Sequence, residues 1–225
     1  MNIETARYHM IEQQIRPWDV ADSLVLDLLS IVKREEFVPK ALKGLAFADL
    51  EIPLQGSGED ALSKGQCMLA PRVEARMLQD LAVKPHETVL EIGAGSGYMA
   101  ALLGKQAQSV VTLEIVPELV TMARDNLRNA GIHNVKVRLA DGANLGMFET
   151  SVDVIVLSGS VSEVPASLLK LLKPGGRLGA IVGSEPVMRG TLITKTGDSA
   201  FKTTQGWDTW APRLQNFPEP SRFTF

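Results

Sequence analysis

The sequence predicts an α/β fold: a doubly wound, mostly parallel Rossmann-like sheet preceded by an N-terminal helical extension. Two observations predict it. From residue 73 onward, short apolar runs typical of buried strands alternate with amphipathic stretches of helical length, and such alternation gives a parallel sheet with right-handed crossovers. In addition, the glycine-rich residues 93–97 follow the first of those strands directly and open a helix, where doubly wound folds bind their ligands.

The N-terminal extension, with a substrate-side loop at its end, is expected at residues 1–72. Apolar residues recur near the 3.6-residue helical period over residues 3–15, and Pro17 marks the end of that helix. Asp22 is placed to cap a second apolar helix in the ten residues that follow it. Residues 33–72 lose the helical period and contain three prolines and a glycine-rich stretch. We expect irregular connections there, and long irregular segments in compact enzymes often line a site.

The rest of the chain, residues 73–225, is expected to form the Rossmann-like core as one compact unit. Strands are expected at residues 88–92, 109–113, 135–139, 152–157, 177–182 and 191–196, and helices at residues 73–83, 98–106, 117–129 and 163–172. Residues 173–176 (Lys-Pro-Gly-Gly) are expected to end the last helix. Residues 217–225 are expected to pair with the last strand.

The composition excludes several classes of function. The 225 residues include 23 Lys and Arg against 26 Asp and Glu, a mildly acidic balance that argues against nucleic acid as a partner. Charges interrupt the N-terminal apolar residues, and no run approaches the roughly 20 apolar residues of a membrane span, so neither a signal peptide nor a membrane segment is expected. Cys67 is the single cysteine and no Cys/His cluster has metal-binding spacing. The sequence predicts a cytoplasmic, metal-free protein and leaves its oligomeric state open.

The glycine loop carries the first chemical signal. It consists of Gly93, Ala94, Gly95, Ser96 and Gly97, with Glu91 two residues before it. Glycines between a strand and a helix let the backbone approach a ligand at the positive end of the helix. The third glycine comes one residue earlier than in the dinucleotide-binding fingerprint, which makes a hydride-transferring dehydrogenase a poor alternative. A tight turn that merely needs small residues is the other alternative.

Two further acidic positions support a ligand site. Glu114, followed by Ile115, ends the second strand 23 positions after Glu91, where a carboxylate can accept hydrogen bonds from both ribose hydroxyls. Asp141 and Gly142 follow the third strand directly, where a polar pair can bind an adenine amino group. Because the carboxyl ends of parallel strands meet at one edge of the sheet, these groups describe a nucleoside-shaped pocket.

These motifs resemble those of the class I S-adenosylmethionine-dependent methyltransferases, and more narrowly those of the protein-L-isoaspartate O-methyltransferases. The narrower resemblance runs from about residue 5 to residue 185, and its segments are residues 34–39 (Arg-Glu-Glu-Phe-Val-Pro), 46–49, 52–54, 65–66, 70–71, 91–98, 114–119, 163–165 and 172–178. It implies S-adenosyl-L-methionine as the cofactor, with its methionine part on the glycine loop, its ribose on Glu114 and its adenine on Asp141. It also implies isoaspartyl-containing proteins or peptides as substrates.

The acceptor side departs from the family pattern. The family's substrate loop usually reads Gly-Gln-Thr-Ile-Ser-Ala-Pro-His, whereas residues 65–72 read Gly-Gln-Cys-Met-Leu-Ala-Pro-Arg. The family's serine therefore falls on Leu69, which has no hydrogen-bond donor or acceptor in its side chain. The catalytic residue stays unassigned, and the acceptor-side candidates are Cys67, Arg72, Ser158 and Ser160.

Three hypotheses about function stay open. The first is carboxyl O-methylation of L-isoaspartyl residues in damaged proteins, which is protein repair. A carboxylate with a pKa near 4 is ionised at neutral pH and needs no general base, so loss of the serine is compatible with activity. The second is a related methyltransferase retargeted to another protein or small-molecule acceptor, which Leu69 motivates. The third is a non-catalytic cofactor-binding module.

Overall fold

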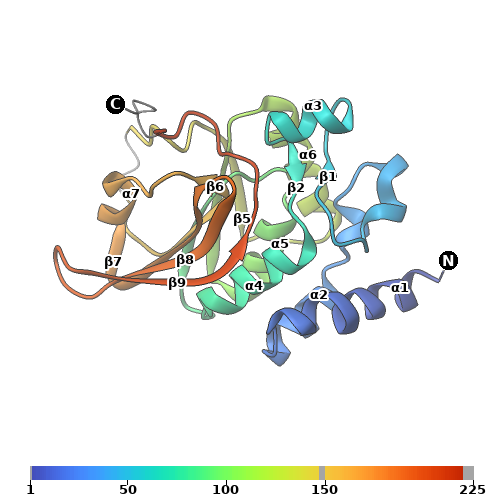
Figure 1. The fold of residues 1–225 in the computed structure, drawn as a ribbon, viewed down its shortest axis with the longest axis horizontal. Coiled ribbons are helices and arrows are strands. Elements are labelled where there is room, and N and C mark those ends of the chain that lie inside the picture. The colour runs from blue at the N-terminus through green and yellow to red at the C-terminus, as the bar shows by residue number, and fades with distance from the viewer. Residues whose placement is uncertain (1, 147–149, 220–225) are drawn as a thin grey trace.

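The computed structural model of the chain describes residues 2–146 and 150–219. The main strands are β3 (Thr88–Ile92), β4 (Ser109–Glu114), β5 (Val135–Leu139), β6 (Val152–Val161), β7 (Leu172–Ser184), β8 (Val187–Lys195) and β9 (Phe201–Thr209). They form one sheet in the order β5-β4-β3-β6-β7-β8-β9 (Figure 1). The first five strands are parallel to their neighbours, and β8 and β9 are antiparallel. The expected doubly wound, mostly parallel sheet is confirmed.

Helices cover the sheet on both faces. The core helices are α4 (Pro71–Leu81), α5 (Tyr98–Gln106), α6 (Pro117–Asn129) and α7 (Ala166–Lys170). Side chains alternate between the faces along each strand, so Val89 joins the apolar cluster beneath α4, α5 and α6, while Leu90 joins the cluster beneath α7. Both residues are buried. Successive apolar residues in a strand thus stabilise two separate layers, as a strand covered on both faces requires.

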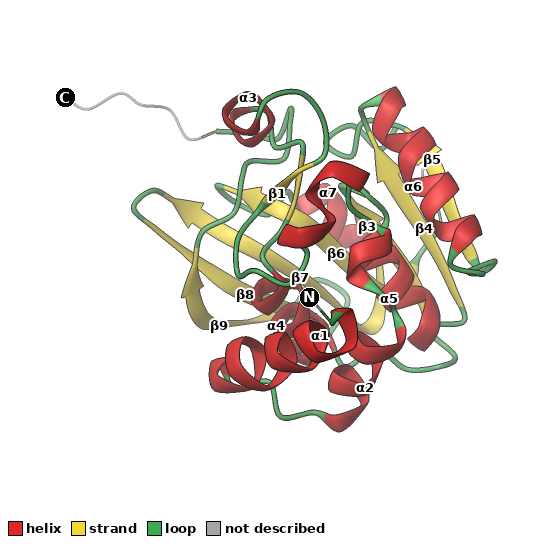
Figure 2. Cartoon of the chain, turned by 90° about the vertical axis from the view of Figure 1, so that its right-hand side faces the viewer, coloured by secondary structure: helices red, strands yellow, loops and turns green. Residues whose placement is uncertain are grey.

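The N-terminal helices form where the sequence predicts them. Asn2 caps α1 (Ile3–Met10), which continues as a π-helical turn over Ile11–Ile15 and a short 3-10 turn over Arg16–Trp18. The Asp22 carboxylate accepts a hydrogen bond from the Leu24 N–H and caps α2 (Ser23–Ile31). In Figure 2 these two helices lie beside α4, and their apolar residues belong to the same cluster as those of α4 and α5.

Residues 33–72 are more ordered than the prediction of irregular connections allowed. They contain two 3-10 helices, Arg34–Glu36 and Lys40–Leu45, the strands β1 (Ile52–Pro53) and β2 (Cys67–Met68), and the helix α3 (Gly58–Ser63). The Ser57 hydroxyl accepts from the Asp60 N–H at 3.3 Å and caps α3. β1 pairs antiparallel with β2 and holds the loop that carries Cys67. The prediction missed α3 because its glycine-rich sequence is also typical of a turn.

Three boundaries in the second half of the core differ from the prediction. α7 begins only after Pro165, because the residue before a proline disfavours the helical conformation. β7 begins at Leu172, so residues 173–176 belong to the strand instead of ending the helix. β8 pairs with β7 on one side and with β9 on the other, so the described residues 217–219 do not pair with it. A short turn suffices to join two antiparallel strands, and β9 therefore pairs with β8 before the chain reaches residue 217. Residues 220–225 lie outside the described part of the chain.

Within the described residues, no helix is both long enough and apolar enough to cross a membrane.

Candidate functional site

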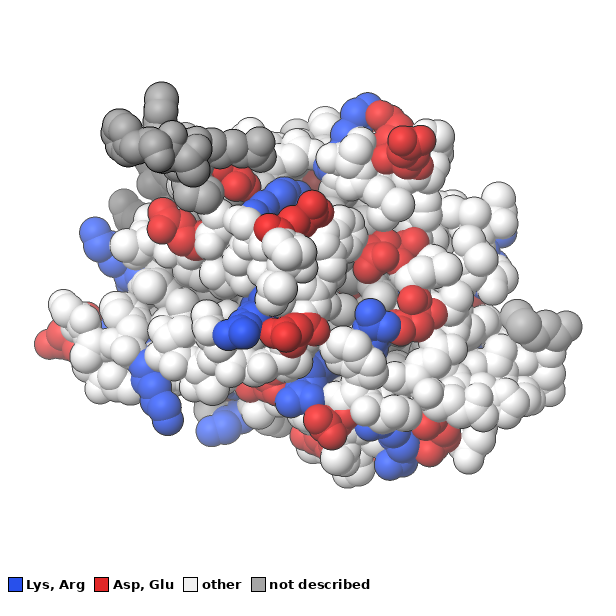
Figure 3. All heavy atoms as spheres, in the orientation of Figure 1, with Lys and Arg blue, Asp and Glu red and all other residues white. Residues whose placement is uncertain are grey.

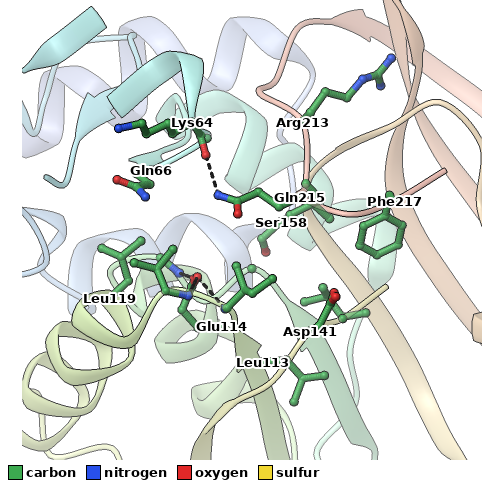
Figure 4. Close-up of a pocket in the computed structure, with 18 of the residues that line it drawn as sticks. Lys64, Gln66, Leu113, Glu114, Leu119, Asp141, Ser158, Arg213, Gln215 and Phe217 are labelled. Carbon is green, nitrogen blue, oxygen red and sulfur yellow. Dashed lines mark hydrogen bonds between the residues drawn. The ribbon is translucent and has the colours of Figure 1, made fainter. Parts of the chain in front are cut away.

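A cleft lies at the carboxyl edge of the sheet, where the strand order reverses between β3 and β6. Doubly wound sheets bind their ligands at this point because the connections leave the edge in opposite directions and open a crevice. The cleft is bordered by the glycine loop, the ends of β4, β5 and β6, the loop between α3 and β2, and a C-terminal segment, residues 213–217 (Figure 4).

The glycine loop forms the floor of the cleft. Gly93 and Gly95 line it with φ angles of 94° and 51°, which glycine adopts without steric cost. The Gly93 N–H donates to the carbonyl oxygen of Leu113 at 2.9 Å and joins the loop to β4. Gly97 does not face the cleft: a Cβ on it would lie 3.2 Å from Cα of Ala123, so it lets α5 pack closely on α6. The loop is therefore open to a ligand on one side and tightly packed on the other.

Glu114 stands at the end of β4 and holds the loop in place. Its carboxylate accepts hydrogen bonds from the N–H groups of Gly95 at 2.8 Å, Ile115 at 2.9 Å and Val116 at 3.0 Å. Glu114 and Ile115 both line the cleft, and Figure 4 shows Glu114 at its edge. A carboxylate has about four acceptor sites, so capacity for a hydroxyl donor remains.

Asp141 and Gly142 border the other end of the cleft. The Asp141 carboxylate accepts from the Ala143 N–H at 2.9 Å and from the side-chain amide of Asn216, also at 2.9 Å. A Cβ on Gly142 would lie 2.2 Å from Cγ2 of Ile92, so no other residue fits there without displacing a buried side chain. The backbone of Gly142 thus packs directly against Ile92 beside Asp141.

Glu91 lies behind the glycine loop, outside the cleft. Its Oε1 accepts from the Ser158 hydroxyl at 2.7 Å, whereas its Oε2 is buried and has no hydrogen-bond partner among the described residues. Both Glu91 and Tyr98, whose hydroxyl is also unpartnered, line a cavity of about 20 Å³, which is large enough for one water molecule. Burial raises the pKa of Glu91 to about 8. Ala94 and Ser96, which belong to the glycine loop, also line this cavity and therefore form the side of the loop that faces away from the cleft.

Six of the residues proposed from the sequence for the cofactor line the cleft, and four lie behind it. The six are Gly93, Gly95, Glu114, Ile115, Asp141 and Gly142, and the four are Glu91, Ala94, Ser96 and Gly97.

The acceptor-side candidates divide in the same way. Cys67 and Ser158 line the cleft, but burial raises the pKa of the Cys67 thiol to about 12, so a thiolate nucleophile is disfavoured. Arg72 is turned away: its guanidinium forms an ion pair with Asp49 and lies 4.3 Å from the ring centroid of Trp18. Ser160 is fully buried, and its hydroxyl donates to a main-chain carbonyl at 2.7 Å. Arg72 and Ser160 therefore stabilise the walls.

The comparison with protein families decides which ligand this cleft suits. Residues 5–209 match the model of the family described as Protein-L-isoaspartate(D-aspartate) O-methyltransferase. The chain belongs to this family. It is an S-adenosylmethionine-dependent methyltransferase, and the fold, enzyme class and cofactor that the motifs implied are confirmed.

Relatives and solved structures agree with this assignment. The methyltransferase is 38% identical to the protein-L-isoaspartate O-methyltransferase of Methanoculleus marisnigri over 177 residues, which cover 79% of this chain and 77% of the relative. It is 36% identical to protein-L-isoaspartate O-methyltransferase 2 of Marinobacter nauticus, with 89% of each chain covered. The fold is also that of a beta-aspartate methyltransferase of Plasmodium falciparum, solved in complex with S-adenosyl-L-homocysteine. That comparison gives a TM-score of 0.76 at 20% identity and covers 96% of this chain and 99% of the other.

The C-terminal segment of the methyltransferase is the part of the site that sequence reasoning missed. Leu214 packs against the glycine loop, and the Gln215 side-chain amide donates to the Lys64 carbonyl at 3.0 Å across the cleft (Figure 4). Asn216 and Phe217 follow beside Asp141. No local pattern marks these residues, because their role depends on a path across the sheet edge that only the assembled fold defines.

Leu69, which stands at the family's serine position, does not line the cleft. Its carbonyl oxygen accepts from the guanidinium of the fully buried Arg34, and its side chain lines a small apolar cavity together with Glu74. The Glu74 carboxylate forms a buried ion pair with Arg34, and burial raises the pKa of Glu74 to about 7. The Leu69 departure from the family pattern thus lies in the wall between the cleft and α4, whereas Cys67 lines the cleft itself.

Proposed function

We propose that the methyltransferase transfers a methyl group to the free carboxylate of L-isoaspartyl residues in damaged proteins. The observation that carries this proposal is the cleft itself: an open glycine loop with two acidic strand ends beside it, in a chain that belongs to the isoaspartyl methyltransferase family. The product is a methyl ester on the polypeptide, and methyl transfer leaves S-adenosylhomocysteine.

The residues of the cleft fit S-adenosylmethionine. Glu114 retains acceptor capacity for ribose hydroxyls, and Asp141 and Gly142 line the same cleft beyond the end of β5. Gly93 and Gly95 present backbone to the methionine part. When bound, the cofactor supplies a sulfonium-activated methyl group. The residues that we propose for it are therefore Gly93, Gly95, Glu114, Ile115, Asp141 and Gly142, with Glu91, Ala94, Ser96 and Gly97 holding the loop behind them.

The chemistry demands positioning more than acid–base catalysis. An isoaspartyl carboxylate has a pKa near 4 and is an anion at neutral pH, so it attacks without losing a proton. Cys67, with its raised pKa, and Leu69, without a polar group, are acceptable neighbours for such a reaction. Ser158 lies at the border of the cleft and donates its single hydroxyl hydrogen to Glu91. We therefore propose that Ser158 limits the position of the acceptor by contact and not by a hydrogen bond to its carboxylate. Orientation of this kind can account for roughly 7–11 kcal/mol of barrier reduction in favourable models.

A retargeted acceptor is the second candidate function, and Leu69 is the observation that favours it. The variant Leu69→Ser separates the two candidates. If the chain methylates isoaspartyl peptides, the wild type already transfers labelled methyl groups to them and the variant changes the rate by less than about tenfold. A wild type that transfers no label to these peptides but methylates another acceptor would support retargeting. S-adenosylhomocysteine binding, measured in parallel, verifies that each protein is folded.

A further inference from the structure

A second hollow adjoins the cofactor cleft near residues 62–65, where the substrate loop begins. We call it the Trp210 groove. It has a volume of about 740 Å³ and is lined by Leu62, Ser63, Ser184, Glu185, Met188, Trp210, Ala211, Pro212, Arg213 and Glu219. These residues come from the end of α3, from the turn between β7 and β8 with the adjoining strand ends, and from residues 210–213 and 219. None of them was singled out by the sequence motifs.

The groove and the cleft share a wall. Arg213 lines both hollows, and the chain passes from the groove to the cleft between Ser63 and Lys64. The wall is thin, because a Cβ on Gly65 would lie only 2.8 Å from the carbonyl oxygen of Arg213. The groove therefore borders the part of the cleft that is lined by Gly65 and Arg213.

The groove offers an aromatic surface held in a fixed orientation. The Trp210 side chain is on the surface, with 39% of the residue exposed, and its indole N–H donates to the Glu185 carboxylate at 2.9 Å. An exposed indole that is fixed by its polar edge presents its apolar face at a low cost in conformational entropy. Met188 lies buried beneath the groove.

The groove also offers hydrogen-bond donors. In Figure 4 the Arg213 side chain points away from the cofactor cleft. Its guanidinium contacts the hydroxyl of Ser184 at 3.1 Å and the carboxylate of Glu219 at 3.0 Å, with a longer contact of 3.4 Å to Ser160. A guanidinium has five N–H donors, so these contacts between described residues leave two for a ligand. Main-chain carbonyl oxygens of an extended peptide are acceptors of the right kind.

We propose that the Trp210 groove binds the polypeptide chain next to the methylated residue, with an apolar side chain on Trp210 and main-chain carbonyls on Arg213. This inference rests on the proposed function, because it takes the acceptor carboxylate to belong to a polypeptide. Because the acceptor carboxylate is part of a polypeptide, the residues that flank it must lie on a surface continuous with the cleft. Trp210 and Arg213 then determine which peptides bind, without taking part in methyl transfer.

The test compares peptide binding in two variants with a matched control. The protein is saturated with S-adenosylhomocysteine and titrated with a ten-residue isoaspartyl peptide that carries apolar residues on both flanks, and with a blocked isoaspartyl dipeptide. We expect Trp210→Ala and Arg213→Gln each to weaken binding of the long peptide about tenfold, which is the usual effect of truncating an aromatic or arginine anchor. The dipeptide should bind the wild type and all three variants equally. Arg189→Gln, on β8 and outside the groove, removes an exposed ion pair with Asp208 and serves as the control.

Equal affinity of Trp210→Ala, Arg213→Gln and the control for the long peptide would contradict the proposal that the Trp210 groove binds the polypeptide. The affinity for S-adenosylhomocysteine, unchanged in Trp210→Ala and in the control, shows that their fold is intact. Arg213 also lines the cofactor cleft, so Arg213→Gln is compared only at saturating S-adenosylhomocysteine. Failure of the proposed function looks different: the wild type would then bind neither isoaspartyl peptide better than its aspartyl counterpart. In that case a ten-residue aspartyl peptide tests whether the Trp210 groove binds polypeptides. If it does, the affinity of the protein for this peptide must still fall in Trp210→Ala.

Discussion

Gly142 shows how strictly single positions define the cofactor cleft. Its missing side chain leaves the space that Ile92 occupies and keeps the backbone beside Asp141 accessible. Glu114 acts in a complementary way, because its carboxylate joins three main-chain N–H groups from two segments into one rigid edge. Small residues and carboxylates that accept main-chain hydrogen bonds, more than reactive side chains, thus shape this half of the site.

The variant Gly142→Ala tests the tight contact with Ile92. The added methyl group would lie 2.2 Å from Cγ2 of Ile92, and overpacking of this kind costs about 1–3 kcal/mol of unfolding free energy. We expect a lower melting temperature and an affinity for S-adenosylhomocysteine reduced about tenfold or more, measured by calorimetry. Gly44→Ala is the matched control, since nothing lies within 4 Å of its added methyl group. Equal melting temperatures and affinities in both variants would contradict the geometry.

The buried carboxyl of Glu91 predicts a pH dependence of stability. Burial raises the pKa of its carboxyl to about 8 in the folded state, well above its ordinary value near 4.5. The folded protein therefore holds the proton more tightly than the unfolded chain, and stability falls as the pH rises between about 5 and 8. We expect Glu91→Gln, which keeps the shape but cannot ionise, to gain on the order of 2 kcal/mol relative to the wild type between pH 5 and pH 8. Denaturant titrations at these pH values measure the free energy of unfolding of both proteins. The same difference between variant and wild type at pH 5 and pH 8 would contradict a raised pKa of Glu91.

At the scale of elements, the C-terminal segment is the fourth wall of the cleft. It crosses from the Trp210 groove over the glycine loop to Asp141, and its side chains bond to both sides of the cleft through Gln215 and Asn216. Sequence patterns predicted the strands β3 to β6 and the glycine loop well, because buried parallel strands and tight turns have local signatures. The wall has no local signature, since residues 213–217 form neither a regular helix nor a strand of the sheet.

The acceptor-side candidates also show what sequence patterns leave undetermined. The sequence predicted that Arg72 and Ser160 lie at the acceptor site. In the structure the Arg72 guanidinium forms an ion pair with Asp49 and contacts the ring of Trp18. The Ser160 hydroxyl donates to a main-chain carbonyl. Partners 23 and more positions away in the chain decided these orientations. Motif spacing predicts which strand end a residue occupies, but the direction of its side chain depends on such distant partners.

The variant Asn216→Ala tests the C-terminal wall as an element. It removes the hydrogen bond to the Asp141 carboxylate, and a bond to a charged group contributes about 1.5–3 kcal/mol. We expect the dissociation constant of S-adenosylhomocysteine to rise about tenfold, with the melting temperature of the protein without ligand lowered by only a few degrees. Asn129→Ala, at the end of α6 and away from the cleft, is the control. Tighter binding in Asn216→Ala would instead identify the segment as an obstacle to the cofactor.

At the scale of the whole molecule, the N-terminal extension and the core share one interior. Arg34, from the extension, is fully buried between Glu74 of α4 and Tyr98 of α5, with its guanidinium 5.2 Å from the Tyr98 ring centroid. Charges of both signs are interspersed over the face shown in Figure 3. The prediction that nucleic acid is not a partner has no direct test in these features and stays a prediction.

The shared interior predicts a single cooperative unfolding transition. The boundary near residue 72 would then separate two segments of sequence and not two units that fold alone. Arg34→Met leaves the Glu74 carboxylate buried without its partner, and removal of one member of a buried pair typically costs about 3–5 kcal/mol. Calorimetry should show one transition in both proteins, shifted to a lower temperature in the variant. Two separate transitions, with only the first one shifted, would contradict a common core.

The central claim is that this methyltransferase esterifies isoaspartyl carboxylates although Leu69 stands at the family's serine position. The most direct measurement is transfer of label from methyl-labelled S-adenosylmethionine to an isoaspartyl peptide and to its aspartyl counterpart. The expected result is base-labile label, as an ester requires, on the isoaspartyl peptide alone. Cofactor binding without label on either peptide would contradict the claim and assign the cleft to a different acceptor.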